Sequence, residues 1–149
     1  MKTVSVIGDG GAPEGSSLYE TARKVGQIVA EKGYVLITGG LFGVMEGATR
    51  GAKEKGGLTV GILPHYESLS NPYVDIKIPS GMGHARNVIV VSSASKIVVA
   101  VGGSYGTLSE IAHALKLGKK VVGFKTWNVE GIENYEDSKE FITRLSSLL

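Results

Sequence analysis

The sequence predicts an α/β fold in which a mostly parallel sheet lies between two layers of helices. Short apolar runs alternate along the chain with segments of helical periodicity. Within each run nearly every residue is apolar, which is typical of parallel strands that are buried on both faces. The chain is 42% hydrophobic and 20% charged, and 22 of its 149 residues are glycine, a balance that favours tight turns in a folded chain. We therefore predict a doubly wound, Rossmann-like three-layer sandwich, formed by residues 1–149 as a single domain.

The elements follow in order from the apolar patterns and from the residues that interrupt them. The first helix carries an apolar stripe; Ser17 and Glu20 match a capping box at its start, and Gly33 ends it. The segment 64–73 is rich in proline, serine and asparagine and is predicted as a loop. The predicted strands are 4–8, 34–38, 58–63, 74–78, 96–101 and 120–124. The predicted helices are 18–33, 43–55, 83–94, 106–117 and 135–149, with irregular chain at 126–134.

Two glycine-rich turns repeat the same strand–turn–helix–strand unit. TGGLFG (38–43) and VGGSYG (101–106) each follow an apolar run and open a helix, and the same spacing separates each turn from the next strand. Glycine lets backbone N–H groups approach a ligand closely, and the helix start adds the positive end of a dipole. A third cluster, GDGG (8–11), also follows a strand. Because ligands of such sheets bind at the carboxyl ends of the strands, we predict a site for a phosphorylated molecule there.

Composition and motifs exclude several classes of function. The chain has no cysteine, which excludes disulfides, thiolate nucleophiles and cysteine-ligated metals. Its histidines are not spaced like metal ligands, and no metal site is expected. The sequence has no P-loop, no serine nucleophile elbow and no acidic residue where a dinucleotide fingerprint needs one. A net charge of +2 and the lack of a signal peptide or long apolar run favour a cytoplasmic protein without nucleic-acid or membrane partners.

Two charged residues carry the candidate chemistry. Arg86 follows a glycine loop at a helix start, where a guanidinium can fork onto a phosphate or carboxylate, and His84 is expected at the rim. Glu110 lies one turn into the helix that follows VGGSYG, where a carboxylate can serve as acid, base or cation stabiliser. Thr107 and Glu110 also match a capping box, so a structural role for Glu110 stays open. The glycines, too, could serve close strand–helix packing alone.

GHARN (83–87), VGGSYGTLSE (101–110) and TGGLFGVMEGA (38–48) resemble motifs of the LOG-like superfamily, over roughly residues 1–125. That superfamily includes cytokinin-activating nucleoside-5′-monophosphate phosphoribohydrolases, molybdenum cofactor carrier proteins and members labelled "possible lysine decarboxylase". Val101 and Asn87 stand where the phosphoribohydrolase pattern has proline and lysine. The residues of these motifs are more similar to those of the molybdenum cofactor carrier proteins. No segment suggests a Schiff-base lysine, so decarboxylation is not expected.

The resemblance implies two functions, both of which stay open. One is hydrolysis of the N-glycosidic bond of a nucleoside 5′-monophosphate, with Arg86 and Glu110 as catalytic residues and no cofactor required. The other is non-enzymatic binding of the molybdenum cofactor, a pterin phosphate, or of a nucleotide. The resemblance also implies a homodimer or homotetramer, and no role is assigned to 126–149. The expected ligand-binding residues are Gly10, Gly11, Gly39, Gly40, Gly43, Met82, Arg86, Asn87, Gly102, Gly103, Ser104, Gly106 and Thr107.

Overall fold

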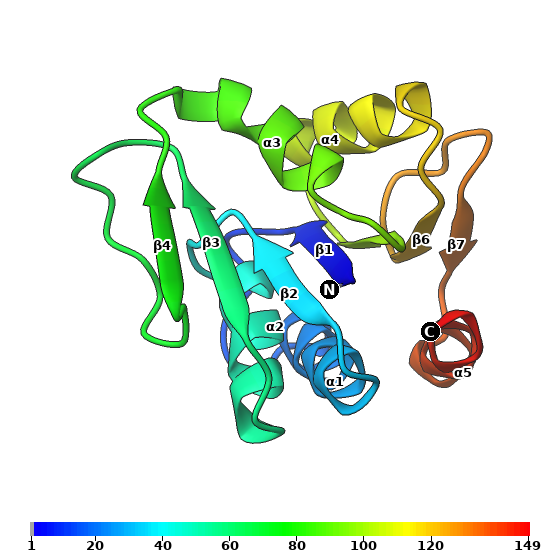
Figure 1. Ribbon diagram of the computed structural model, residues 1–149. Coiled ribbons are helices and arrows are strands. Elements are labelled where there is room, and N and C mark those ends of the chain that lie inside the picture. The colour runs from blue at the N-terminus through cyan, green and yellow to red at the C-terminus, as the bar shows by residue number, and fades with distance from the viewer. Residues whose placement is uncertain (1) are drawn as a thin grey trace.

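The computed structural model describes residues 2–149 and confirms the three-layer α/β fold (Figure 1). Within these residues the strands form one sheet in the order β4-β3-β2-β1-β5-β6-β7, and all neighbouring strands run parallel. The strands are β1 (Thr3–Gly8), β2 (Val35–Thr38), β3 (Thr59–Leu63), β4 (Ile76–Pro79), β5 (Val98–Val101), β6 (Val121–Phe124) and β7 (Glu133–Tyr135). The helices are α1 (Ser17–Glu31), α2 (Val44–Glu54), the 3-10 helix η1 (Gly83–Arg86), α3 (Asn87–Ser92), α4 (Tyr105–Lys116) and α5 (Ser138–Leu148).

The chain reverses its direction across the sheet between β1 and β5. From β1 it runs outward through β2 and β3 to β4, returns to place β5 on the other side of β1, and continues through β6 to β7. The carboxyl ends of β1 and β5 therefore lie side by side, and Gly8 pairs with Val101. In open α/β sheets, ligands bind outside the strand ends at such a switch point.

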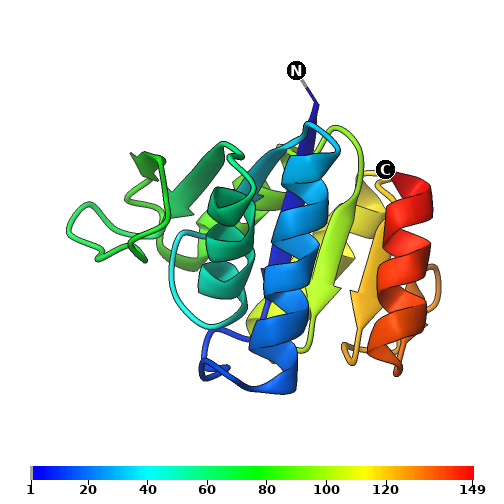
Figure 2. The ribbon, with the colours of Figure 1, turned by 90° about the horizontal axis from the view of Figure 1, so that it is seen from below.

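The two helical layers explain why the strands are apolar along their whole length. Helices α1, α2 and α5 cover one face and α3 and α4 cover the other; Figure 2 shows the first face. Successive strand residues point to opposite faces. Leu36 and Val99 accordingly belong to the buried cluster beneath α1, α2 and α5, whereas Ile37 and Val98 belong to the cluster beneath α3 and α4.

Helices α1 and α2 pack with their backbones in contact. A Cβ atom added at Gly26 of α1 would lie 1.9 Å from the carbonyl oxygen of Ala48, and one at Gly51 of α2 would lie 1.9 Å from that of Arg23. Only glycine permits this approach. The start of α2 also contacts the loop that follows β1, where the Val44 amide donates to the Asp9 carbonyl at 2.8 Å.

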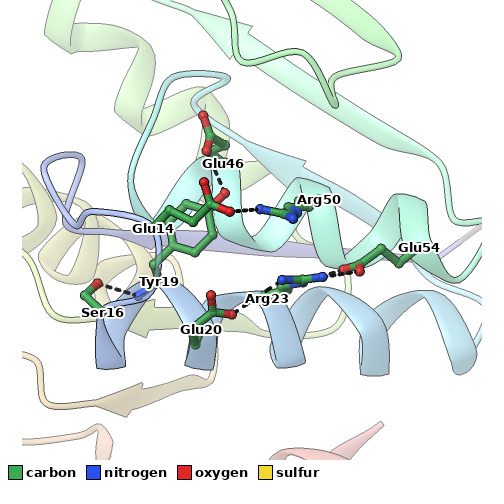
Figure 3. A network of polar contacts seen from close by, with 8 residues as sticks. All are labelled: Glu14, Ser16, Tyr19, Glu20, Arg23, Glu46, Arg50 and Glu54. Atoms are coloured by element: carbon green, nitrogen blue, oxygen red, sulfur yellow. Dashed lines mark hydrogen bonds and ion pairs between the residues drawn. The ribbon is translucent and has the colours of Figure 1, made fainter.

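Polar contacts join the same two helices along their outer edge (Figure 3). The buried Tyr19 hydroxyl donates a 2.6 Å hydrogen bond to Glu46. Arg23 bonds to Glu54 through Nε at 2.7 Å. Burial, followed by the bond to Glu46, raises the pKa of Tyr19 to about 12, so this hydroxyl stays a donor at neutral pH.

The cap of α1 lies one residue earlier than predicted. Ser16, not Ser17, is the N-cap, and its hydroxyl accepts a hydrogen bond from the Tyr19 amide at 3.3 Å. The reason is the preceding turn, in which the Ser16 amide bonds to the carbonyl of Pro13 at 3.0 Å. This turn leaves Ser16 extended, with ψ at 159°, as an N-cap requires.

The C-terminal part departs further from the prediction. The chain predicted as irregular at 126–134 leads into β7, which extends the sheet beside β6. The last helix begins at Ser138 rather than 135, because the Asp137 side chain accepts a hydrogen bond from the Glu140 amide at 3.1 Å and caps it. The strand predicted at 74–78 is β4, Ile76–Pro79, which begins two residues later and ends one residue later than predicted. Within residues 2–149, no helix is long and apolar enough to cross a membrane.

Candidate functional site

A cavity of about 260 Å³ opens at the switch point, beside the carboxyl ends of β1 and β5. We call it the switch-point cavity. The ends of β1 and β2, η1 with the start of α3, and the first turns of α4 contribute its walls. Of the residues predicted to form a site, those that line it are Gly10, Gly39, Arg86, Asn87, Ser104, Gly106, Thr107 and Glu110.

Arg86 lines the cavity and is buried, with 7% of its surface exposed. Its Nε donates to the Ile62 carbonyl at 2.8 Å, and its Nη1 donates to Oδ1 of Asn87. Nη2 lies against the backbone of Gly39, because a Cβ added there would be 2.8 Å from it. Among residues 2–149, Nη2 has no hydrogen-bond acceptor. The guanidinium is thus fixed by two bonds and keeps donors for a ligand.

Glu110 faces the same cavity from the second turn of α4. The residue is 9% exposed, and no donor or ion-pair partner within residues 2–149 contacts its carboxyl. Burial raises the pKa of Glu110 from 4.5 to about 8, and the positive charge of Arg86 only partly offsets this. Burial also lowers the pKa of Arg86, opposed by the charge of Glu110, although an arginine side chain stays charged in proteins.

The start of α4 presents free backbone N–H groups to the cavity. Its N-cap, Ser104, makes no side-chain cap bond, and the first bond of the helix runs from the Leu108 amide to the Ser104 carbonyl at 3.0 Å. The amides of Gly106 and Thr107 precede that bond and belong to cavity-lining residues. A helix start of this kind binds anions.

The capping box considered for Thr107 and Glu110 is not formed. Thr107 lies inside α4 rather than at its N-cap, and Glu110 is buried one turn further on. Thr107 instead packs against the turn: a Cβ added at Gly103 would lie 2.2 Å from the threonine hydroxyl oxygen. Gly103 also has a φ of 106°, which side chains disfavour.

The first glycine turn forms a wall of the cavity and offers fewer free backbone N–H donors than the second turn. The Val44 amide, at the start of α2, already donates to the Asp9 carbonyl at 2.8 Å. A Cβ added at Gly43 would lie 2.3 Å from that same oxygen, so glycine is needed for the close approach. The two turns, which are similar in sequence, therefore differ in what their helix starts can bind.

The other predicted site residues lie behind the cavity lining or beside it. Gly40 packs against Leu63, and a Cβ added there would lie 2.6 Å from that side chain. The Gly11 amide donates to the Asp9 carboxylate at 2.8 Å. Met82 is half exposed before η1. The predicted residues that do not line the cavity are Gly11, Gly40, Gly43, Met82, Gly102 and Gly103.

The chain after β6 supports the second glycine turn, a role that no pattern in the sequence predicted. The hydroxyl of Thr126 donates to the Gly102 carbonyl at 2.7 Å, and Nε1 of Trp127 donates to the Ser104 carbonyl at 2.9 Å. The Trp127 ring also lies 5.8 Å from the ring of Tyr105. Asp9 and Met45 join the lining without having been predicted, as does His84, which was expected at the rim.

Comparison with known proteins extends these observations. An uncharacterised protein of Archaeoglobus fulgidus is 51% identical over 95% of this chain and 93% of its own length. The structure of the molybdenum cofactor binding protein from the phototrophic bacterium Rippkaea orientalis matches with a TM-score of 0.86 and 35% identity, over 99% of this chain and 98% of that one. The molybdenum cofactor carrier protein of Chlamydomonas reinhardtii matches with a TM-score of 0.85 and 34% identity, again over 99% and 98%.

The model of one family spans nearly the whole chain. The SLOG cluster4 family matches residues 1–147, a range that holds both glycine turns and the entire switch-point cavity. Together with the relatives above, this match confirms the resemblance to LOG-like proteins. The chain belongs to the SLOG cluster4 family.

Proposed function

We propose that this protein binds a phosphorylated small molecule in the switch-point cavity, and that the ligand is the molybdenum cofactor, held for delivery. The observation that carries the proposal is that two independent sets of hydrogen-bond donors suited to an anion line one cavity. These donors are the free Nη2 of Arg86 and the N–H groups at the start of α4. A phosphate accepts hydrogen bonds from both kinds of donor.

The relatives favour this ligand over a nucleotide. The solved structures from Rippkaea orientalis and Chlamydomonas reinhardtii are of proteins described as binding or carrying the molybdenum cofactor, and their likeness extends over nearly the whole chain. The residues present suit the phosphate end of a pterin phosphate, because Arg86 and the α4 amides supply charge and directional donors together. Asp9 and Asn87 add polar groups to the same lining.

The proposal can be tested by calorimetric titration. The probes are ribose 5-phosphate, adenosine 5′-monophosphate and molybdenum cofactor released from a molybdoenzyme. We expect the cofactor to bind most tightly, and Arg86→Ala to weaken all three by at least about tenfold through loss of a charged hydrogen-bond donor. Lys24→Ala removes the same charge from an exposed site on α1 and should leave binding unchanged. Failure of all three probes to bind the wild-type protein would overturn the proposal.

Hydrolysis of a nucleoside 5′-monophosphate is the second candidate, and the position of Glu110 favours it. The carboxyl lines the cavity that would hold the ribose phosphate, and with a pKa of about 8 it is mostly protonated at pH 7. In that state it could protonate the leaving base as a general acid, but it could not stabilise an oxocarbenium ion by its charge. Base release from a panel of nucleoside monophosphates, lost in Glu110→Ala, would support this reaction. No release supports binding alone.

Assembly into a homodimer or homotetramer remains a prediction from the family resemblance, as does a cytoplasmic location. The edge strand β4 favours assembly, because it exposes Ile76 and Ile78 by 47% and 45%, and soluble monomers keep such apolar patches small. Light scattering that gives the mass of one chain at micromolar concentration would contradict it.

A further inference from the structure

The carboxyl of Glu110 is a polar group of the switch-point cavity that lacks a protein partner, as does Nη2 of Arg86. Glu110 is more than nine-tenths buried and lines the cavity, and none of residues 2–149 gives its carboxyl a hydrogen bond. Arg86, whose positive charge acts on this carboxyl, directs Nε to Ile62 and Nη1 to Asn87 instead. Among residues 2–149, no fully buried side-chain oxygen or nitrogen lacks a partner, so the carboxyl oxygens reach the surface of the cavity, where a ligand can contact them.

We propose that Glu110 enters the complex as a neutral carboxylic acid and donates its proton in a hydrogen bond to an anionic oxygen of the ligand. Binding is thereby coupled to one proton and weakens in alkaline solution. This inference rests on the proposed binding of a phosphorylated ligand. An ionised carboxylate at this position would have no proton to donate and would repel a phosphate bound beside it.

The surroundings of Glu110 support the neutral form. Burial lifts its pKa to about 8, with Arg86 as the opposing charge. The other charged or titratable groups that line the cavity are Asp9, from the end of β1, and His84, from η1. On its own helix, His113 is exposed and lies outside the lining. Arg86 stays cationic at alkaline pH, so Glu110 is the lining group whose charge we expect to change just above neutrality.

The test measures the binding of ribose 5-phosphate between about pH 7 and about pH 9.5. A phosphomonoester has its second pKa near 6 and is a dianion throughout this range, so the ligand itself does not titrate. This probe also has no base to lose. If only the protonated form binds, the dissociation constant rises roughly 30-fold over the range, given a pKa of about 8. Calorimetry in buffers of different ionisation enthalpy should show uptake of nearly one proton at the upper end.

Two variants define the source of the pH dependence. Glu110→Gln keeps a donor of the same shape that cannot ionise, so its dissociation constant should change less than about threefold over the range. Glu136→Gln removes a carboxyl that is exposed before α5 and should keep the 30-fold rise. An infrared carbonyl band of a protonated carboxyl at pH 7, absent in Glu110→Gln, reports the neutral acid directly, even if that variant binds poorly.

The outcomes separate this inference from the proposed function. A wild-type dissociation constant that stays flat with pH, or a rise that persists in Glu110→Gln, overturns the role of Glu110 while leaving ligand binding intact. Absence of binding by the wild-type protein at pH 7 overturns the proposed function instead. A missing infrared band overturns the neutral acid whatever the binding result.

Discussion

Arg86 and Glu110 face the same cavity, yet the arginine is held by Ile62 and Asn87 and not by the glutamate. A direct ion pair would neutralise both groups and close the site to anions. Without such a pair, Nη2 of Arg86 stays free, and burial raises the pKa of Glu110 to about 8 although the charge of Arg86 opposes the shift. The raised pKa of Glu110 should be visible in the stability of the unliganded fold.

Glu110→Gln should change how stability depends on pH. The unfolded carboxyl ionises near 4.5, whereas the folded one keeps its proton up to about 8. Between these values the folded protein binds more protons, so the free energy of unfolding of the wild type falls as pH rises, by on the order of 3–5 kcal/mol in total. Urea denaturation should show this fall, with a much flatter profile for Glu110→Gln, which becomes the more stable protein at pH 8.5. Parallel profiles for the two proteins would show that Glu110 titrates normally.

Gly106→Ala should separate ligand binding from folding. A Cβ added at Gly106 meets no atom within 4 Å, and the residue is helical and lines the cavity. Alanine in a helix is favoured over glycine by about 0.5–1 kcal/mol, so the melting temperature should rise. The added methyl group borders the space where a phosphate would contact the α4 amides, and binding of ribose 5-phosphate should weaken several-fold. Unchanged or tighter binding would place the phosphate elsewhere.

The three layers of the fold, and the edge of the sheet that holds the candidate site, could be predicted from the sequence because both depend on local patterns. Apolar runs mark strands buried on two faces, and glycine turns mark the places where strands pass into helices. The strand β7 was missed because it is short and only partly buried, so it has no apolar run. The bond from the Val44 amide to Asp9, which occupies one donor of the first turn, joins distant segments, and no spacing in the sequence reports it.

The contact of Trp127 also joins distant segments and could not be predicted from the sequence, and its role is testable. Its indole N–H holds the Ser104 carbonyl at the start of α4. Trp127→Phe keeps a ring beside Tyr105 but removes that bond, which is worth about 0.5–1.5 kcal/mol. We expect ribose 5-phosphate to bind about three- to tenfold more weakly, because the α4 amides lose their fixed position, with a loss of stability below about 1.5 kcal/mol. Wild-type affinity in this variant, measured by the same titration, would show that the turn keeps its shape without the indole.

Gly39→Ala should displace Arg86 while leaving the fold largely intact. A Cβ at this position would lie 2.8 Å from Nη2 of Arg86 and 2.9 Å from the sulfur of Met45. Both atoms belong to long side chains that can move, and neither is backbone. The guanidinium must therefore shift, and its bond to the Ile62 carbonyl weakens at a cost of about 1 kcal/mol in stability. Binding of ribose 5-phosphate should fall by at least about tenfold, since a displaced guanidinium no longer directs its paired N–H groups at the phosphate.

Gly10→Ala is the matched control for this variant. Its Cβ would lie 3.5 Å from the end of the Met45 side chain, which is an ordinary contact, and Gly10 lines the same cavity. Equal losses in the two variants would mean that crowding of the cavity, rather than the position of Arg86, sets the affinity.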